Sequence, residues 1–503
     1  MKIALLSRWY WEENRRFGEE GGSTRQLAEA IAARGHEVVV LSQSPLTRKM
    51  RRERIGELEV WVSPRDKRRG FMIGWRDKMA KKTYNHRKIF SDAMALREFL
   101  SRRGPFDVLW AHTESPDGLV AAFARQSGTN VPPILLQIQA LRYRFEKGNP
   151  VFTEKVPLML AFRHATRIIA NSEMVAGYLG AYTGPSLPAD ELAAKVRVAY
   201  PNLHRNFLHA AQEVPAPPPR RDRILFLGAL NPGKGALTFL KALPKTELSK
   251  RSAVFAVIGD FTENNPRFAK RWEEQKEATR IQTLGARIEY LGKVSPEEVI
   301  RQIRLAQAVV VPSLFDAFNR ALAEALVLGR PVVTTDRVGA AALVHAHKCG
   351  IVVVPNDPDS LGRALDAIIS PLLPFANNAQ HLGPQLAVEL SPEHVAVRME
   401  HDLARTAGLA PGPGDHVKHE TTPVHIDELP AEEAVAEEEQ PVYEEETEAA
   451  ESYETELVEE EQVGAEEELS AEEPPAEEIV EPEDVGETEE LPPPPQKTGT
   501  EEW

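Results

Sequence analysis

The chain has 503 residues, enough for two or three domains, each with its own core. Its single cysteine excludes a disulfide framework and a cysteine-based metal site, and no run of about 18 apolar residues is present that could span a membrane. The formal net charge of -16 is divided unevenly, because residues 411–503 hold 34 acidic and 2 basic residues while residues 1–410 hold 42 and 58. A basic body is therefore followed by an acidic tail.

The N-terminal sequence, MKIALLSRWYWEE, becomes polar after a short apolar run. That run is too short for a signal peptide. The sequence therefore predicts a cytoplasmic protein that is at most peripherally bound to a membrane.

Strand-like apolar runs alternate with amphipathic stretches through residues 1–370. Several are continuous Val, Ile and Leu runs, which are typical of strands buried on both faces. Helical stretches such as TRQLAEAIAARG and PEEVIRQIRLAQ lie between them and predict an α/β protein with parallel, doubly wound sheets. In chain order, the predicted strands are KIALLS, HEVVVLS, LEVWVS, FDVLWAH, PILLQI, TRIIAN, KVRVAY, RILFLG, AVFAVIG, RIEYLG, AVVVPS, PVVTTD and GIVVVP.

The Pro-rich stretch QEVPAPPPRRD separates the two halves of this pattern. We expect two Rossmann-like domains that face a cleft, formed by residues 1–210 and 223–387 and joined by a linker at 211–222. Residues 411–503 are rich in Glu, Pro and Ala and show no sustained apolar period, so they are predicted to be disordered. This tail is either a solvated solubility segment or an arm that binds a protein partner.

Residues 48–88 carry 15 basic and 5 acidic residues. Apolar side chains are interleaved with the charges, a pattern typical of an interfacial helix on an anionic membrane. The alternative is a basic surface loop whose aromatic residues pack inward. No RNA-binding motif accompanies the charge, so nucleic acid is the weaker interpretation. The interleaved residues are Phe71, Met72, Ile73, Trp75 and Met79.

Ligands of doubly wound sheets lie beyond the carboxyl ends of the strands, where helices begin. Gly21 and Gly22 follow the first predicted strand, where glycines let the backbone approach a phosphate at a helix N-terminus. The alternative is a flexible loop. Lys234, in NPGKG, occupies a strand-to-helix turn of the second half, where an ammonium group can meet a diphosphate or simply lie in solvent.

Two carboxylates eight residues apart interrupt the apolar segment PSLFDAFNRALAEALVLGRPVV, which spans residues 312–333. Asp316 falls in the loop after a buried strand, and Glu324 falls in a helix predicted over 319–328. Both are expected to face the cleft and accept hydrogen bonds from vicinal hydroxyls, such as those of a sugar and a ribose. The alternative is that Asp316 caps the helix and Glu324 is a solvated helix residue.

These segments together resemble the family 4 glycosyltransferases, retaining enzymes of the GT-B fold. The resemblance extends over roughly residues 1–405 and includes GGSTRQLAEAIAARGHEVVVLS, ATRIIANSE, FLGALNPGKG and GIVVVPNDPDSL. The central family signature is Glu-x7-Glu followed by Ala-x-x-x-Gly-x-Pro-Val. In this chain it stands as Asp316, Glu324, Ala325, Gly329, Pro331 and Val332.

The resemblance implies transfer of a sugar from a nucleoside diphosphate sugar to an unidentified glycan, lipid or small-molecule acceptor, without a metal or other cofactor. Asp316 would bind hydroxyls of the donor sugar, Glu324 would bind the ribose, and Lys234 would neutralise the diphosphate. The backbone of Gly21 and Gly22 would approach the outer phosphate. Beside these, the donor-binding set includes Phe318, Asn319 and Arg320, and the catalytic set comprises Asp316, Lys234 and Gln139.

The resemblance also implies that a C-terminal helix within residues 388–407 crosses back onto the first domain. Three positions depart from the family pattern. Ala229 replaces an arginine of the diphosphate site, Gln139 replaces a histidine, and Asp316 replaces a glutamate. These departures favour an alternative function, a weakened or inactive GT-B module that binds a sugar nucleotide or supports a partner enzyme.

Arg320 stands where the family usually has a small or apolar residue. We expect it to reach the phosphates or the sugar and to replace the arginine missing at Ala229. The alternative is that it points into solvent or pairs with Glu324, four residues later.

A D-x-D sequence, Asp357 to Asp359, precedes a predicted helix, where aspartate is an ordinary cap, so we interpret it as structural and predict no metal site. His112, at the end of a predicted strand of the first half, either lines the cleft or has a structural role.

Overall fold

The computed structural model describes residues 1–409 except 18–20, 65–85, 142, 147–148, 153–154, 214–218, 262–265, 284–285 and 371–373. The predicted disorder of the acidic tail therefore lies outside the described residues. So do the apolar residues of the basic segment, Phe71 to Met79. Both parallel sheets belong to one compact unit, Met1–Val424.

The first sheet has eight strands in the order β10-β9-β6-β5-β1-β2-β4-β3. All neighbours pair in parallel except β3 and β4, which are antiparallel. It contains all seven strands predicted in the first half of the chain. The strands are β1 (Lys2–Leu6), β2 (Glu37–Ser44), β3 (Arg51–Ile55), β4 (Leu58–Pro64), β5 (Val108–Ala111), β6 (Ile134–Ile138), β9 (Arg167–Ala170) and β10 (Val196–Val198).

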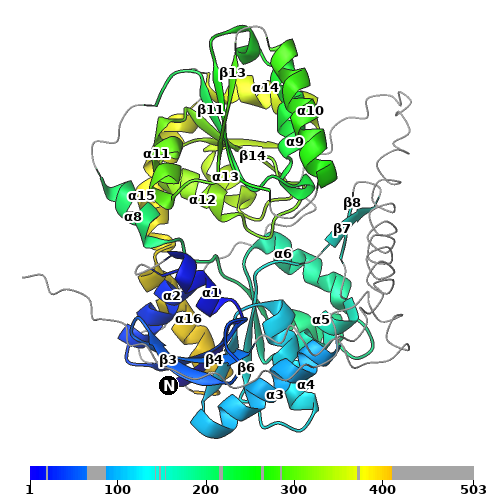
Figure 1. Ribbon diagram of the computed structural model, residues 1–503, viewed down its shortest axis with the longest axis vertical. Helices are drawn as coiled ribbons and strands as arrows, with labels where there is room; N and C mark the ends of the chain where they lie inside the picture. Colours follow the sequence, from blue (N-terminus) through cyan, green and yellow to red (C-terminus); the bar gives the residue numbers. More distant parts are fainter. Residues whose placement is uncertain are drawn as a thin grey trace, which may run out of the picture. The chain divides into compact units, whose positions relative to one another are not determined.

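Helices cover both faces of this sheet (Figure 1). The last described helix, α16 (Pro392–Thr406), packs against α2 (Ser23–Ala33), and its Met399 and Leu403 join the core beside Leu5 and Val40 of the central strands. The other helices of this part are α1 (Tyr10–Phe17), α3 (His86–Arg103), α4 (Leu119–Gln126), α5 (Lys155–His164), α6 (Glu173–Tyr178) and α7 (Ala189–Lys195). A small antiparallel pair, β7 (Tyr143–Glu146) and β8 (Asn149–Phe152), was not predicted from the sequence.

The second sheet has six strands in the order β13-β12-β11-β14-β15-β16, and all its neighbours pair in parallel. All six correspond to predicted strands. In the central strand β14, for example, Val309, Val310 and Val311 are all at most 1% exposed, as expected for an apolar run buried on both faces of a sheet. The strands are β11 (Arg223–Leu227), β12 (Val254–Ile258), β13 (Arg287–Gly292), β14 (Ala308–Val311), β15 (Val332–Thr335) and β16 (Gly350–Val353).

Separate apolar cores form on the two faces of the second sheet, as expected for a doubly wound fold. One face packs on α9 (Ala236–Ala242), α10 (Pro266–Gln282) and α14 (Pro358–Ile368). The other packs on α8 (Arg205–Gln212), α11 (Pro296–Leu305), α12 (Arg320–Val327), α13 (Ala341–His347) and α15 (Phe375–Glu389). Residues 211–212 of the predicted linker are thus the end of helix α8.

Residues 51–55 and 58–64 of the basic segment 48–88 form strands, so no single interfacial helix spans the segment. The membrane interpretation rests on the interleaved apolar residues outside the described part and stays a prediction. Residues 51–55 are the edge strand β3, which pairs with β4, and the segment ends in the first turn of α3. Exposed arginines on an edge strand discourage pairing with another chain, which accounts for the charge of RRERI without a lipid.

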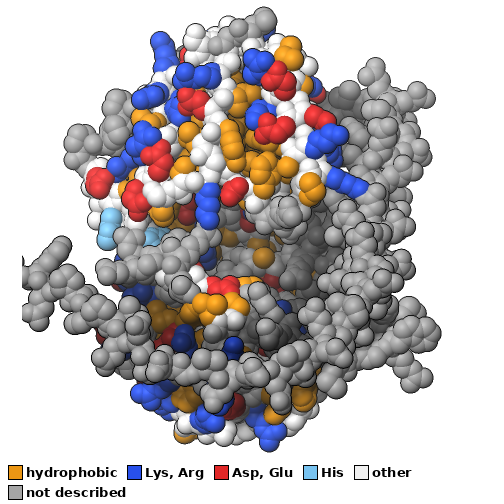
Figure 2. All heavy atoms as spheres, in the orientation of Figure 1, with side chains coloured by type: hydrophobic (Ala, Val, Ile, Leu, Met, Phe, Trp, Pro, Cys, Tyr) orange, Lys and Arg blue, Asp and Glu red, His pale blue; other side chains and the backbone are white. Residues whose placement is uncertain are grey.

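Charges of both signs are mixed on the described surface. On the face shown in Figure 2, basic and acidic side chains are interspersed with apolar ones over the second sheet and its helices. Helix α10 illustrates this, with ion pairs between Lys276 and Glu273 and between Arg280 and Glu277. In the part of the chain that the structure describes, no helix is both long and apolar enough to cross a bilayer.

Candidate functional site

A cavity of about 430 Å³ lies where loops from both sheets meet, beyond the carboxyl ends of several strands. Its volume is in the range of small-molecule sites. It brings together six of the nine predicted site residues: Gln139, Lys234, Asp316, Phe318, Asn319 and Arg320. Gly21, Gly22 and Glu324 are not among the residues that line it.

Asp316 is fixed by the loop that follows β14. Its backbone N–H donates to Arg337 O at 2.9 Å, and its carbonyl accepts from Gly339 N at 2.9 Å. Asn319 has a left-handed backbone, with φ of 70°, and its side-chain oxygen accepts from Leu322 N as the N-cap of α12. The Asn319 amide then donates to Asp316 Oδ2 at 2.9 Å. Asn319, not Asp316, is therefore the helix cap, and Asp316 remains available to the cavity.

The same loop is anchored on the first sheet's side of the molecule. Phe315 and Ala317 are buried in the apolar core that also contains strands β5 and β6. The Ser172 hydroxyl donates to Ala317 O at 2.6 Å, and the Phe315 ring packs edge-on against Tyr178. Residues on both sides of Asp316 thus tie the end of β14 to helix α6, which sets the position of the carboxylate.

Lys234 lies in a tight turn between β11 and α9. Asn231 caps this turn by accepting from Lys234 N at 3.0 Å. Gly235 has φ of 69°, and a Cβ there would lie 1.9 Å from Pro312 O, so only glycine lets the turn pack against the end of β14. As a result, Lys234 Nζ forms an ion pair with Asp316 Oδ2. Lys234 and Asp316, two predicted site residues that are 82 positions apart in the sequence, are therefore in direct contact.

His112 follows β5 and lines the cavity, which confirms the first of its two interpretations. Its Nδ1 lies 3.2 Å from Ser7 Oγ, and its Nε2 lies 3.2 Å from Thr24 Oγ1 and 3.3 Å from Gln139 Nε2. Burial and, to a smaller extent, the positive charge of Arg320 lower the pKa of His112 to about 3. The imidazole is therefore neutral at pH 7 and acts as a hydrogen-bonding group.

The backbone of Gln139 is held in place by the buried carboxyl group of Glu114. The backbone N–H of Gln139 donates to Glu114 Oε2 at 2.9 Å, and its carbonyl accepts from Asn171 Nδ2 at 3.1 Å. Burial raises the pKa of Glu114 to about 7. The Gln139 side chain is thereby directed to His112 at the edge of the cavity.

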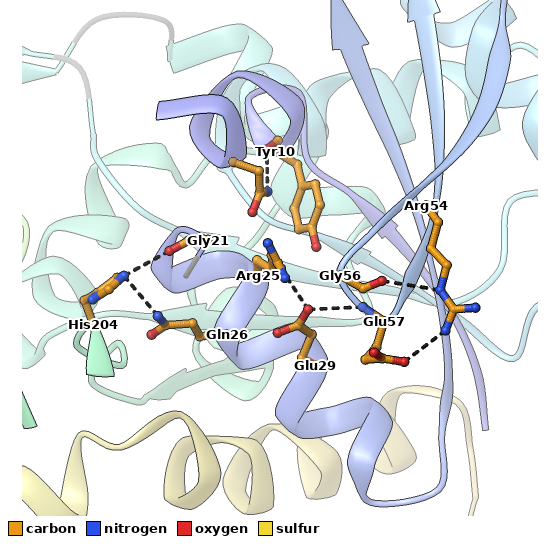
Figure 3. Close-up of polar contacts among 10 residues, drawn as sticks. Tyr10, Gly21, Arg25, Gln26, Glu29, Arg54, Gly56, Glu57 and His204 are labelled. Atoms are coloured by element: carbon orange, nitrogen blue, oxygen red, sulfur yellow. Dashed lines mark hydrogen bonds and ion pairs between the residues drawn. The ribbon is translucent and has the colours of Figure 1, made fainter. Parts of the chain in front are cut away.

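The Gly21–Gly22 turn opens α2, as predicted, and is held by the N-cap residue of α8. His204 Nε2 donates to Gly21 O at 2.9 Å and also lies 3.0 Å from the Gln26 amide (Figure 3). A Cβ on Gly22 would lie only 2.1 Å from Glu13 Oε1. The Glu13 carboxylate, which is hydrogen-bonded to Thr24, thus lies against the helix N-terminus that was predicted to meet a phosphate.

Arg320 lies in the first turn of α12 and lines the cavity, so the alternative in which it points into solvent is wrong. Its Nη1 donates to Ser23 Oγ at 2.9 Å, at the first residue of α2. Glu324 lies one helical turn later and is partly buried. Burial raises the pKa of Glu324 to about 7, and the Arg320 charge opposes this shift.

The side chain of Phe318 is 2% exposed and packs against the Tyr200 ring, with 5.3 Å between the centroids. Its role in this structure is to hold the start of α12 in the core. Asp357 accepts hydrogen bonds from the backbones of Asp359 and Ser360, both at 3.0 Å, and is the N-cap of α14. This confirms the structural interpretation of the D-x-D sequence.

Several cavity residues were not identified from the sequence. Trp9 and Thr113 follow strands β1 and β5, where the strand-end rule could have found them. Glu13 lies in α1 and carries no motif. The other missed lining residues include Thr24, Asn171 and Pro201.

The raised pKa of Glu324 predicts how stability depends on pH. Between its usual value of 4.5 and about 7, the folded protein holds a proton on this carboxyl that the unfolded chain has lost. Its contribution to stability therefore falls as pH rises through this range. We expect Glu324→Gln to raise the melting temperature at pH 8 but not at pH 4.5, measured by calorimetry beside Glu274→Gln, an exposed control on α10. The same change in both variants at both pH values would contradict this prediction.

The chain matches two family models: the Glycosyl transferase 4-like domain over residues 21–194 and the Glycosyl transferases group 1 model over residues 221–370. An uncharacterized glycosyltransferase of Methanocaldococcus jannaschii is 29% identical over 154 residues, which cover 29% of this chain and 35% of that protein. The alpha-D-kanosaminyltransferase of Streptomyces kanamyceticus is 23% identical over 254 residues, which cover 47% and 61%. The matched segments thus span less than two thirds of either relative.

Two solved structures share the fold at low sequence identity. Sucrose-phosphate synthase from Thermosynechococcus elongatus superposes with a TM-score of 0.59 and 18% identity, over 80% of this chain and 98% of that one. Anabaena HepE, in complex with UDP and glucose, gives a TM-score of 0.54 and 18% identity, over 80% and 99%. With two parallel-sheet α/β halves and both domain models in order, the chain belongs to the family 4 glycosyltransferases, of GT-B fold.

Proposed function

We propose that this protein transfers a sugar from a nucleoside diphosphate sugar to an acceptor hydroxyl, with retention of configuration and without a metal ion. The observation that supports this most directly is the meeting of Lys234, Asp316 and Arg320 around one cavity at the strand ends of both sheets. Two cations and a carboxylate suit the two parts of such a donor, the anionic diphosphate and the sugar hydroxyls.

The chemistry of this transfer requires a stabilised leaving group. When the bond between the sugar and the diphosphate breaks, negative charge grows on the diphosphate, and fixed cations nearby favour that change. Lys234 and Arg320 are proposed to supply this charge, and Asp316 to position the sugar through its hydroxyls. Glu324, one turn beyond the lining residues, is proposed to accept from the ribose at the end of the cavity.

Related structures suggest where to begin the search for the donor. HepE was solved with UDP and glucose, and a trehalose-6-phosphate structure from E. coli with UDP-2-fluoro glucose. We therefore propose a UDP sugar as the first candidate donor for this chain.

The single cysteine of the chain, Cys349, is buried and free, which supports a reducing, cytoplasmic location.

Ala229 favours a second candidate function. It lines the cavity beside Lys234, at the position where the resemblance leads one to expect an arginine. A chain that lacks this cation could bind a sugar nucleotide without turning it over, as an inactive module or a partner of another enzyme.

One experiment separates the two functions. Calorimetry with UDP-, GDP- and ADP-glucose and GDP-mannose measures donor binding, and mass spectrometry of the same mixtures with candidate acceptors detects donor hydrolysis or transfer. We expect binding of at least one donor together with turnover. Tight binding without any turnover would support the inactive module, and no binding of any nucleotide would overturn both proposals.

A further inference from the structure

Helix α2 begins without a cap from its own N-cap residue, because Gly22 has no side chain that could accept a hydrogen bond. The carboxylate of Glu13, from helix α1, supplies the acceptor instead. It is hydrogen-bonded to both the hydroxyl and the backbone N–H of Thr24, the second residue of α2. The first N–H groups of a helix and its dipole attract an anion, and the anion that α2 holds in this structure belongs to the chain itself.

Glu13 also fills the space that Gly22 leaves open. A Cβ on Gly22 would lie 2.1 Å from Glu13 Oε1 and 2.3 Å from Glu13 Cδ, so the carboxylate lies directly against the glycine backbone. Glu13 and Thr24 line the cavity at this end of α2, whereas Gly21 and Gly22 do not. The carboxylate therefore lies between the cavity and the backbone that was predicted to approach a phosphate.

The Glu13 carboxylate shares a second group with the proposed donor site. Burial raises the pKa of Glu13, and the charges of Arg320, from α12, and His204, from α8, oppose this shift. The ionised form of Glu13 is thus stabilised by the same guanidinium that is proposed to bind the diphosphate. Carboxylate and phosphate oxygens accept from the same kinds of donor, and two anions at one place repel each other. Glu13 and a diphosphate therefore exclude each other at the start of α2.

We propose that Glu13 is an internal competitor of the donor: its carboxylate occupies the place of a phosphate oxygen at the start of α2, and a bound diphosphate displaces it. This inference rests on the proposed function and adds a regulation of the same site. Because the hydrogen bonds of Glu13 must break before the diphosphate forms its own, the chain binds a donor more weakly than its cations alone would allow. A ligand without a diphosphate leaves Glu13 in place.

The test uses the full-length protein and calorimetry. The probes are UDP, GDP and ADP, each measured beside its own nucleoside, which has the same base and ribose but no phosphate. The variants are Glu13→Ala and Glu13→Ser, which both remove the carboxylate and its reach to Gly22. The matched control is Glu12→Ala, which removes the same charge from the neighbouring residue of α1 and does not alter the lining of the cavity.

We expect both Glu13 variants to bind the diphosphate at least about threefold more tightly than the wild type, the range for an anion at a helix N-terminus. The affinity for the nucleoside should be the same in the variants and the wild type, which also shows that the variants are folded. Glu12→Ala should leave both affinities unchanged. A gain in affinity on removing a side chain from the wall of a binding cavity is not expected of a residue that only supports the fold.

Two results would overturn the inference. The first is diphosphate affinity that is unchanged or weaker in both Glu13 variants, as expected if Glu13 only caps α2. The second is an equal gain for the nucleoside, which would place the effect of Glu13 away from the phosphates. Failure of the wild type to bind any of the three diphosphates overturns the proposed function first, and this inference with it.

Discussion

Lys234→Ala is expected to lower the affinity for UDP at least tenfold. A charge-assisted hydrogen bond from an ammonium group to a phosphate contributes about 1.5–3 kcal/mol, which corresponds to about 10- to 150-fold in Kd. The ion pair with Asp316 adds to the effect, because removing the ammonium leaves a carboxylate without its cation in a cavity that must accept a diphosphate. Isothermal titration of UDP into wild type and variant measures the change directly.

A double variant separates two roles of Lys234. If the lysine contacts the diphosphate, Lys234→Ala with Asp316→Asn should remain weak, because only the repulsion from Asp316 has been removed. If the lysine acts only by neutralising Asp316, the double variant should regain wild-type affinity for UDP. Lys241→Ala, an exposed lysine on the neighbouring helix α9, is the matched control and should leave the affinity unchanged. Wild-type affinity in Lys234→Ala itself would remove this residue from the donor site.

Much of the fold follows from local apolar patterns. The thirteen predicted strands all appear, because runs such as the valines of β14 leave no polar position for a solvent face and so require burial on both sides. The helix predicted over residues 319–328 is observed as α12 with Asn319 as its cap and Leu328 as its last flanking residue. Local signals of this kind depend on neighbours in the sequence, which is why they could be interpreted without a structure.

The edge strand β3 is an element that local sequence patterns did not predict. Its sequence RRERI has one apolar residue in five, and it pairs with β4 at the edge of the first sheet. The charge of RRERI contributed to a membrane interpretation of residues 48–88, and the strand places these five residues in the sheet without testing that interpretation. Tertiary context decided the conformation, as it often does for strands.

In the candidate site, likewise, some features could be predicted from the sequence and others could not. The signature loop indicated Asp316, Asn319 and Arg320, but the sequence could not show that Lys234 pairs with Asp316 or that Glu324 lies one turn beyond the lining residues. The pairing of Lys234 with Asp316 depends on a contact between residues that are 82 positions apart in the sequence. The position of Glu324 depends on how far helix α12 extends from the cavity.

Arg320→Ala is expected to weaken UDP binding by about 1–3 kcal/mol, or about 5- to 150-fold in Kd, if this arginine serves in place of the one missing at Ala229. Both positions line the same cavity as Lys234. In the structure without ligand, Arg320 donates to Ser23 Oγ, a neutral partner that a diphosphate can displace because its charge makes it the stronger acceptor.

Rescue and a matched control make the prediction about Arg320 specific. Ala229→Arg returns a guanidinium to the strand end beside Lys234, so the double variant Arg320→Ala, Ala229→Arg should recover part of the lost UDP affinity. Ser23→Ala removes the present partner of Arg320 but leaves its charge in the cavity, so it should keep UDP affinity within about threefold, because a bound diphosphate would displace this hydroxyl in any case. If Arg320 only tethers α12 to α2, Ser23→Ala and Arg320→Ala should weaken UDP binding equally, and the added arginine should restore nothing. Unchanged UDP affinity in Arg320→Ala would end its assignment to the diphosphate, because a cation that touches a leaving diphosphate cannot be removed without a measurable loss of binding.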